Sequence, residues 1–142
     1  IELVRELHGV KYYNDSIASS PSRTIAGLHS FRQKVILIAG GYDKHIPFDV
    51  LGPEICAHVK TLVLCGATAG KIRAAVENEP EYREGEPQIL EANNLREAVE
   101  LAKNAAEAGD VVTLSPACAA FDQFKNFAVR GKTFKEIVNS LT

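Results

Sequence analysis

Val35-Ile36-Leu37-Ile38-Ala39-Gly40-Gly41 is the stretch of sequence that decides the predicted fold. Its five apolar residues run without a polar interruption, which is typical of a strand covered on both faces in a parallel sheet. Two other short runs, residues 61–65 and 110–114, are also mostly apolar and continuous. Helical patterns lie between the three runs, and this alternation predicts right-handed strand–helix–strand units.

The segments between the runs carry signals for helix starts. A helix is expected from Ser20-Pro21, since a capping residue there precedes proline at the first helical position. A second helix is expected from about Thr68, and a third begins at Asn94 in a sequence that resembles a capping box. The Thr-x-x-Glu pattern that starts at Thr133 predicts the cap of a last helix.

The beginning of the chain differs from this pattern. Residues 1–7 and 10–13 are predicted to form a β-hairpin around a His8-Gly9 turn, and residues 88–90 a short additional strand. The predicted fold is therefore α/β: a Rossmann-like, doubly wound, mostly parallel sheet with an N-terminal β-hairpin and helices on both faces. Because no linker interrupts it, we interpret residues 1–142 as one domain.

Length and composition fit one ordinary domain and exclude several classes of protein. The chain has 142 residues, of which 46% are hydrophobic and 24% charged, close to globular averages. Sixteen Lys and Arg against eighteen Asp and Glu give a net charge of −2, which argues against nucleic-acid binding. The apolar runs are too short for membrane insertion. Three cysteines, far apart in sequence, form neither a zinc motif nor a paired framework, which favours the reducing cytoplasm.

Ligands of open α/β sheets gather beyond the carboxyl ends of the strands, and four segments of this sequence are predicted to lie there. Each contains small residues and a helix start, so backbone N–H groups point to one edge of the sheet. Lys44 adds a full positive charge, and this edge is therefore predicted to bind an anion, either a carboxylate or a phosphate. The four segments are residues 14–21, 40–45, 66–68 and 115–121.

Several other features have simpler explanations. Gly40-Gly41 alone is more often a tight turn than a ligand site, and no P-loop or dinucleotide motif accompanies it. Cys118 lies near Ser115 without a histidine, so we interpret it as a small buried residue rather than a nucleophile. The four histidines show no metal-binding spacing, and no metal site is predicted. His45 alone lies near the proposed edge.

The motifs in these loops are specific when they are taken together. Asn14-Asp15-Ser16-x-Ala18-Ser19 comes first, followed by Gly40-Gly41-x-Asp43-Lys44 and then by the nearly unbroken block of residues 115–127. With Arg130-Gly131-x-x-Phe134 behind them, these motifs closely resemble the C-terminal domain of the Mur ligase family, in particular its D-glutamate-adding members. The resemblance covers essentially the whole chain.

The resemblance implies a three-domain, ATP-dependent, cytoplasmic enzyme of peptidoglycan synthesis. Its N-terminal domain would hold UDP-N-acetylmuramoyl-L-alanine, and its central domain would carry the P-loop and most ligands of Mg²⁺. The present chain, which begins at Ile1 rather than Met, would be the third domain, which brings D-glutamate and closes over ATP. ATP would phosphorylate the substrate's carboxylate, and the D-glutamate amine would attack this acyl phosphate to form the amide. The chain by itself is expected to be inactive.

Five residues match D-glutamate-binding positions of the family. Lys44 and Ser19 match a lysine and a threonine that contact one carboxylate of D-glutamate, and Ser19 retains the hydroxyl group. Ala120 and Phe121 match a Ser-Leu pair that contacts the other carboxylate. Because alanine lacks the serine hydroxyl, only backbone N–H groups could bind that carboxylate here. Phe127 matches a residue that lines the same pocket.

Two further residues, Asn14 and Asp15, match the motif that meets the adenosine side of ATP when the domain closes. The family's usual lysine after this motif is Ile17 here, which removes a positive charge from the site. Arg23, one or two helical turns further on, is a candidate to compensate for that loss.

Two alternatives stay open at this point. The chain could come from a related ligase that adds another amino acid or from a folate-glutamate ligase, although the block of residues 115–127 favours D-glutamate. It could also be a non-catalytic, Rossmann-like binding module. Tests of the full-length protein with a panel of amino acids would distinguish these alternatives.

Overall fold

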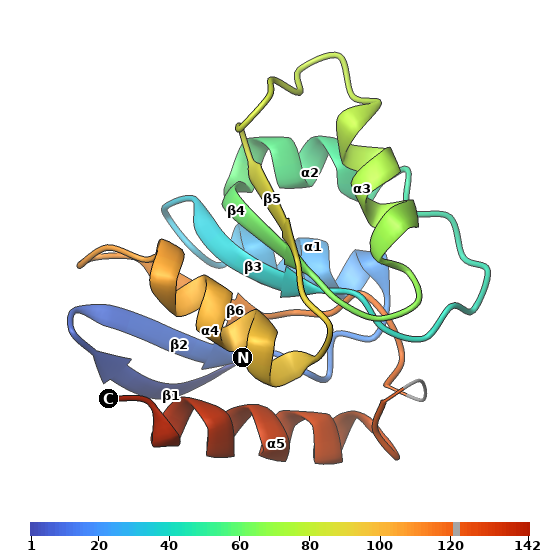
Figure 1. The fold of residues 1–142 in the computed structure, drawn as a ribbon. Helices are drawn as coiled ribbons and strands as arrows, with labels where there is room; N and C mark the ends of the chain where they lie inside the picture. Colours follow the sequence, from blue (N-terminus) through green and yellow to red (C-terminus); the bar gives the residue numbers. More distant parts are fainter. Residues whose placement is uncertain (121–122) are drawn as a thin grey trace.

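A six-stranded sheet forms the centre of the structure, with strand order β1-β2-β6-β3-β4-β5 (Figure 1). The computed structural model describes residues 1–120 and 123–142. The first two strands pair antiparallel, with Leu7 opposite Val10, and the other pairs of neighbours run parallel. The strands are β1 Glu2–Leu7, β2 Val10–Asn14, β3 Val35–Ala39, β4 Val59–Leu64, β5 Gln88–Glu91 and β6 Val111–Leu114.

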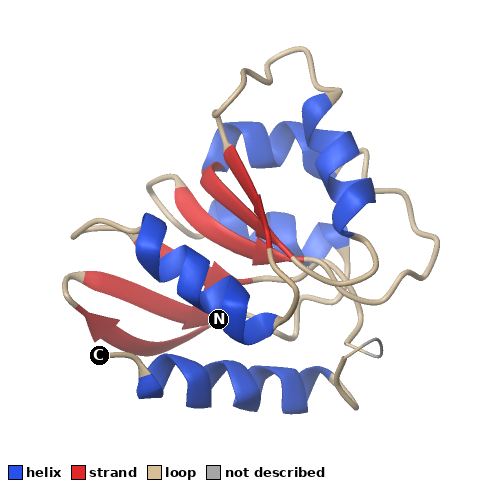
Figure 2. Ribbon diagram, viewed as in Figure 1, coloured by secondary structure: helices blue, strands red, loops and turns tan. Residues whose placement is uncertain are grey.

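Helices cover both faces of this sheet (Figure 2). One face packs against the first three helices, and the other face packs against the last two. Among the described residues, none of the helices combines the length and the apolar character needed to cross a bilayer. The helices are α1 Pro21–His29, α2 Leu51–His58, α3 Ala69–Glu77, α4 Leu95–Ala105 and α5 Phe127–Ser140.

The strand β3 shows why the fold could be predicted from its apolar runs. All five of its residues are at most 1% exposed. Ile36 and Ile38 pack with α4 and α5, whereas Leu37 and its alternate neighbours pack with α1, α2 and α3. A strand with two buried faces needs apolar side chains at every position, so a continuous run results. The predicted fold class, including the hairpin and the helices on both faces, is confirmed.

Three of the four predicted helix starts are confirmed. The helix α1 begins at Pro21, α3 follows Thr68, and α4 follows Asn94. The Asn94 side chain accepts a hydrogen bond from the backbone N–H of Glu97 at 2.8 Å, as a helix cap does.

Two helical features differ from the predictions. The helix α2 was not predicted, because it has only eight residues, contains Pro53 and follows Val50, which provides no side-chain cap. The last helix begins at Phe127 rather than near Thr133, so the predicted cap is wrong. Asn126 is the actual cap, and its Oδ1 accepts a hydrogen bond from the Val129 N–H at 2.9 Å.

Replacing Asn126 by alanine should therefore destabilise the protein by about 1 kcal/mol, the usual effect of removing a helix N-cap. The matched control is Thr133→Ala, which removes a hydroxyl that donates to the Val129 carbonyl one turn back along α5. Such a bond contributes little to helix stability, so the control should change the free energy of unfolding by much less. Urea unfolding measures both values, and equal losses would contradict the assignment of the cap.

Candidate functional site

Three of the four predicted loop segments are hydrogen-bonded to one another at the carboxyl edge of the sheet. They follow β2, β6 and β3, which are neighbours in the sheet and parallel, so their carboxyl ends lie together. The N–H of Gly40 donates to the Pro116 carbonyl at 2.9 Å, and the N–H of Ala117 donates to the Ala18 carbonyl at 2.9 Å. The loops thus form one continuous surface, as the sequence predicts for an open α/β sheet.

Thr68 connects the remaining segment to this surface. Its hydroxyl oxygen accepts a hydrogen bond from the Gly41 N–H at 3.0 Å and lies 3.2 Å from the Cys118 sulfur. Thr68 is completely buried, and Cys118 is only 3% exposed. This burial confirms that Cys118 is a small packing residue, because a nucleophilic thiol must be reached by its substrate.

Arg130 of α5 is the central cation of the loop assembly, although it is only 4% exposed. Its guanidinium group donates to the Ser16 carbonyl at 2.7 Å and to the Cys118 carbonyl at 2.9 Å. It also donates to the Ser16 hydroxyl at 2.9 Å and lies 3.5 Å from the Ser19 hydroxyl. One buried fork of donors therefore fixes the loops after β2 and β6 relative to each other. No sequence signal distinguishes such an arginine from an exposed one, so sequence reasoning assigned it no role.

Asp15 belongs to a buried hydrogen-bonded network below these loops, with only a small part of it exposed. The Ser115 hydroxyl donates to Asp15 Oδ2 at 2.8 Å, and Asp15 is 6% exposed. Burial raises the pKa of the Asp15 carboxyl above its usual range, although the hydrogen bond from Ser115 opposes this effect. A Cβ atom at Gly27 would lie only 2.7 Å from Asp15 Oδ2, so a glycine lets α1 approach the carboxylate. Asp15 therefore connects α1 to the end of β6.

Asn14 and Phe127 share a hollow on the side of α5. The Asn14 Oδ1 accepts a hydrogen bond from the Ser16 N–H at 3.0 Å, and the Ser16 hydroxyl donates to the Phe127 carbonyl at 2.7 Å. The Phe127 side chain is 44% exposed. A volume of about 440 Å³ lies between these residues, and Lys132 and Lys135 also line it. Glu2 also lines the hollow and forms an ion pair with Lys135 at 3.3 Å, so its carboxylate offsets part of the positive charge of the two lysines.

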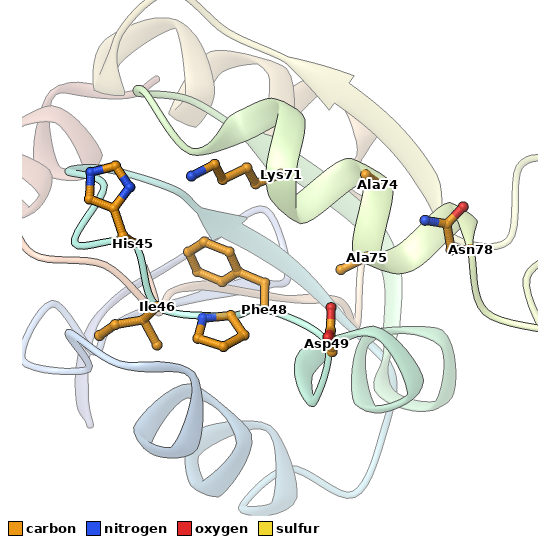
Figure 3. Close-up of a pocket in the computed structure, with 9 residues that line it drawn as sticks. His45, Ile46, Phe48, Asp49, Lys71, Ala74, Ala75 and Asn78 are labelled. Carbon is orange, nitrogen blue, oxygen red and sulfur yellow. The ribbon is translucent and has the colours of Figure 1, made fainter.

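Lys44 is exposed on the loop after β3. Its neighbour Asp43 instead accepts hydrogen bonds from Lys71 at 2.5 Å and from the His45 N–H at 2.7 Å, and both lower the pKa of the Asp43 carboxyl. In the part of the chain that the structure describes, no carboxylate forms an ion pair with Lys44. Beside this loop, a hollow of about 400 Å³ opens toward α3, with Phe48 and Lys71 on its wall (Figure 3).

The predicted D-glutamate residues thus fall into separate groups. Ser19 and the buried Ala120 lie on the two loops that Arg130 connects, and Phe127 lines the neighbouring hollow. Within the described ranges, no hydrogen bond or ion pair joins Lys44 to any of these residues. Phe121 lies outside the described residues. Their roles in ligand binding stay predictions.

Arg23 lies where it could compensate for the lysine that Ile17 replaces. Both residues line a hollow of about 260 Å³ at the amino end of α1, together with Asp15 and Ala18. Arg23 is exposed, and its charge also lowers the pKa of Asp15 slightly against the larger effect of burial. Its position is consistent with the compensation hypothesis.

Sequence reasoning missed one cluster of potential metal ligands at the other edge of the sheet. His29 ends α1, Glu54 and His58 lie on α2, and one ligand atom of each is within 4.8 Å of the others. The spacing of Glu54 and His58, four residues apart, was a visible signal, because such residues share a helix face. The contribution of His29 depends on how two helices pack, and no sequence motif indicates it.

The fold and the assembled loops define a class of protein: an open α/β domain with a predicted ligand-binding edge, where the loops after neighbouring parallel strands are hydrogen-bonded to one another. Within this class, the chain belongs to the Mur ligase family, since the family model of the Mur ligase glutamate ligase domain matches residues 1–118.

Proteins of known name are similar to the chain over nearly its whole length. It is 62% identical over 144 aligned positions to the UDP-N-acetylmuramoylalanine–D-glutamate ligase of Acetivibrio thermocellus, and 60% identical over 140 to that of Clostridium kluyveri. The corresponding ligase of Clostridium botulinum is 56% identical over 140. Each comparison covers 99% of this chain but only 31% of the relative, so the chain spans about a third of these proteins.

Solved structures support the fold independently of close sequence similarity. A murein peptide ligase from Psychrobacter arcticus matches 99% of the chain and 30% of its own length, with a TM-score of 0.62 at 11% identity. A domain of a Haemophilus ducreyi protein, described as a ligase for L-alanyl-γ-D-glutamyl-diaminopimelate, has a TM-score of 0.60 at 14% identity, covering 96% of this chain and 98% of that domain. At these identities the likeness concerns the fold alone.

Proposed function

We propose that the chain is the D-glutamate-binding C-terminal domain of a UDP-N-acetylmuramoylalanine–D-glutamate ligase. The observation that carries this proposal is the 56–62% identity, over 99% of the chain, to proteins of that name. The remaining two thirds of such a ligase would supply the UDP-sugar site and the ATPase centre as N-terminal and central domains. The reaction would form an amide bond in peptidoglycan synthesis in the cytoplasm.

D-Glutamate has two carboxylates to be held while its amine stays free to react. Lys44 supplies an exposed ammonium group, and Ser19 supplies a hydroxyl on a loop that Arg130 holds in place. Charge-assisted hydrogen bonds of this kind are the strong ones, and a fixed orientation of the amine favours its attack on the acyl phosphate. Around Ala120, which is 2% exposed, backbone N–H groups would serve the other carboxylate, and Phe127 would cover the apolar part of the ligand.

The C-terminal and central domains would contribute different parts of the sites for ATP and Mg²⁺. Asn14 and Asp15 fit a positioning role at the adenosine side of ATP, because their side chains hold the loop that would face it. Among the described residues, the only cluster of potential metal ligands lies at the opposite edge of the sheet, not beside these loops. We assign Mg²⁺, which would neutralise phosphate charge during acyl phosphate formation, mainly to the central domain, as the resemblance to the Mur ligase family implies.

The proposal is tested by measuring phosphate release from ATP by the full-length protein with UDP-N-acetylmuramoyl-L-alanine and a panel of amino acids. D-Glutamate should give the highest turnover, while L-glutamate, L-lysine and diaminopimelate should give little. The 142-residue chain alone should release no phosphate. A preference for another amino acid would indicate a different ligase, and the absence of any turnover in the full-length protein would favour a binding module.

Removal of the Arg23 side chain should raise the KM for D-glutamate several-fold in the full-length enzyme, if Arg23 replaces the charge lost at Ile17. The matched control is Arg32→Ala, which removes the same charge from an exposed position beyond the other end of α1. An exposed charge that acts over a distance contributes little to ligand binding. The control should therefore leave the KM for D-glutamate unchanged within experimental error. An unchanged KM in Arg23→Ala would exclude the compensation hypothesis.

A further inference from the structure

His29, Glu54 and His58 form a compact group at the amino edge of the sheet, away from the loops of the proposed D-glutamate site. The His29 Nε2 lies 2.7 Å from Glu54 Oε2, and the His58 Nε2 lies 3.5 Å from the same oxygen. The two imidazole rings have their centroids 4.9 Å apart. Three potential ligand atoms thus lie within 4.8 Å of one another, close enough to share one ion.

The positions of these side chains are determined by the hydrophobic core. Leu28, directly before His29, is 1% exposed, and Ile55, directly after Glu54, is completely buried. Both belong to the core that packs α1 and α2 on the same face of the sheet. Because the helices cannot rotate without exposing these residues, the backbone positions that carry His29, Glu54 and His58 stay close to one another.

Two imidazole nitrogens and a carboxylate are a common set of protein ligands for Zn²⁺. A tetrahedral site with metal–ligand distances of about 2.0–2.1 Å places its ligand atoms about 3.3 Å apart. The observed separations of 2.7 and 3.5 Å lie on either side of this value, and all three atoms are within 4.8 Å of one another. Small side-chain rotations would therefore bring the three atoms onto one metal ion.

The surroundings also favour a cation with an open coordination position. His29 and His58 both lie in the last turn of their helices, where the helix dipole attracts positive charge. The exposed fractions of the His29, Glu54 and His58 side chains are 53%, 29% and 34%, so water can reach the remaining position. Without an ion, these side chains form a His29–Glu54 hydrogen bond and a contact between Glu54 and His58 four residues apart on α2. Both imidazole nitrogens converge on the same carboxylate oxygen, and this convergence places the three potential ligand atoms together.

We propose that His29, Glu54 and His58 bind a divalent transition-metal ion of the zinc class, with water as a further ligand. Bound there, the ion connects α1 to α2 directly. The site lies where α1 and α2 lead into β3 and β4, at the edge of the sheet opposite to the loops. Its role is therefore stabilising rather than catalytic, and it does not depend on the proposed ligase activity.

The experiment measures Zn²⁺ affinity of the full-length protein by competition with a chromophoric chelator at about pH 7.5, where imidazole is mostly neutral. Wild-type protein should bind one Zn²⁺ more than His29→Gln or His58→Gln. Each substitution should weaken this site by more than about 10–100-fold, the loss that even an outer-shell change produces. Glu54→Gln provides a third, conservative variant, and the exposed His8→Asn is the control that should bind like wild type.

Two further readouts separate this site from adventitious binding. Co²⁺ bound at the site should give visible absorption bands. A thiolate ligand would add a charge-transfer band in the near ultraviolet, and the absence of this band would exclude Cys56 as a ligand. Zn²⁺ should raise the unfolding temperature of wild type and of His8→Asn but not of the three cluster variants. Equal Zn²⁺ affinity in wild type and His58→Gln, or a thiolate band in the Co²⁺ spectrum, would overturn the proposal.

Discussion

Gly40→Ala should destabilise the protein by about 3 kcal/mol or more. The φ angle of Gly40 is +109°, and a residue with a side chain in such a conformation loses about 1–3 kcal/mol. An added Cβ would also lie 2.0 Å from the carbonyl oxygen of Cys65 at the end of β4. Because this neighbour is backbone, no side-chain rotation relieves the overlap, and overpacking of this kind costs a further 1–3 kcal/mol or so.

The effect is measured by urea unfolding followed by circular dichroism, and Gly70→Ala is the matched control. Gly70 lies in α3, no heavy atom lies within 4 Å of its added Cβ, and alanine is the better helix former. The control should be neutral or more stable by up to about 1 kcal/mol. The same small change in both variants would show that Gly40 is an ordinary turn residue rather than the place where two strands closely approach.

The strands could be predicted because burial on both faces requires apolar residues, and these are visible in the sequence. β3 is buried on both faces, so each of its residues must be apolar, and β4 and β6 share most of this constraint. Their mostly parallel arrangement followed from the rules for strand–helix–strand connections, whereas the order of the strands in the sheet was not predicted. The location of the ligand edge followed in turn, since the carboxyl ends of parallel strands lie together.

The start of α5 and the existence of α2 were less predictable, for a different reason. A capping pattern such as Thr133-x-x-Glu136 occurs by chance inside many helices, and the residue that actually caps α5 is Asn126, seven residues earlier. The helix α2 has few internal signals and depends on contacts with α1 and α3 for its stability. In short helices, tertiary packing outweighs intrinsic propensity.

The contacts within the candidate site depend on long-range packing and left no local signal. Arg130 reaches Ser16 across 114 positions of the chain, and Ser115 reaches Asp15 across 100. The residue types are ordinary, and only the assembled sheet brings them together. The same reasoning explains why His29 was not connected with Glu54 and His58. Pattern analysis could therefore predict which loops come together at the carboxyl edge of the sheet but not the hydrogen bonds that join them.

Lys44→Ala should raise the KM of the full-length enzyme for D-glutamate by about 10–150-fold, with a much smaller change in kcat. Removing a hydrogen bond to a charged group costs about 1.5–3 kcal/mol, and 1.4 kcal/mol corresponds to a factor of ten. Lys44 is exposed and forms no ion pair with the described residues, so its loss should leave the free energy of unfolding nearly unchanged. Steady-state kinetics at fixed ATP and UDP-sugar concentrations measure the effect.

Lys34→Ala is the control that distinguishes a specific contact at the position of Lys44 from a general effect of its positive charge. Lys34 lies just before β3 begins, whereas Lys44 follows its end, so the two lysines flank one strand at opposite edges of the sheet. Both substitutions change the net charge equally, and a general electrostatic attraction of D-glutamate would weaken similarly in both. A specific carboxylate contact at the carboxyl edge would instead be lost only in Lys44→Ala, and Lys44→Arg should recover part of it because the positive charge is kept. Equal KM values in Lys44→Ala and Lys34→Ala would remove Lys44 from the proposed site while leaving the fold and the family membership intact.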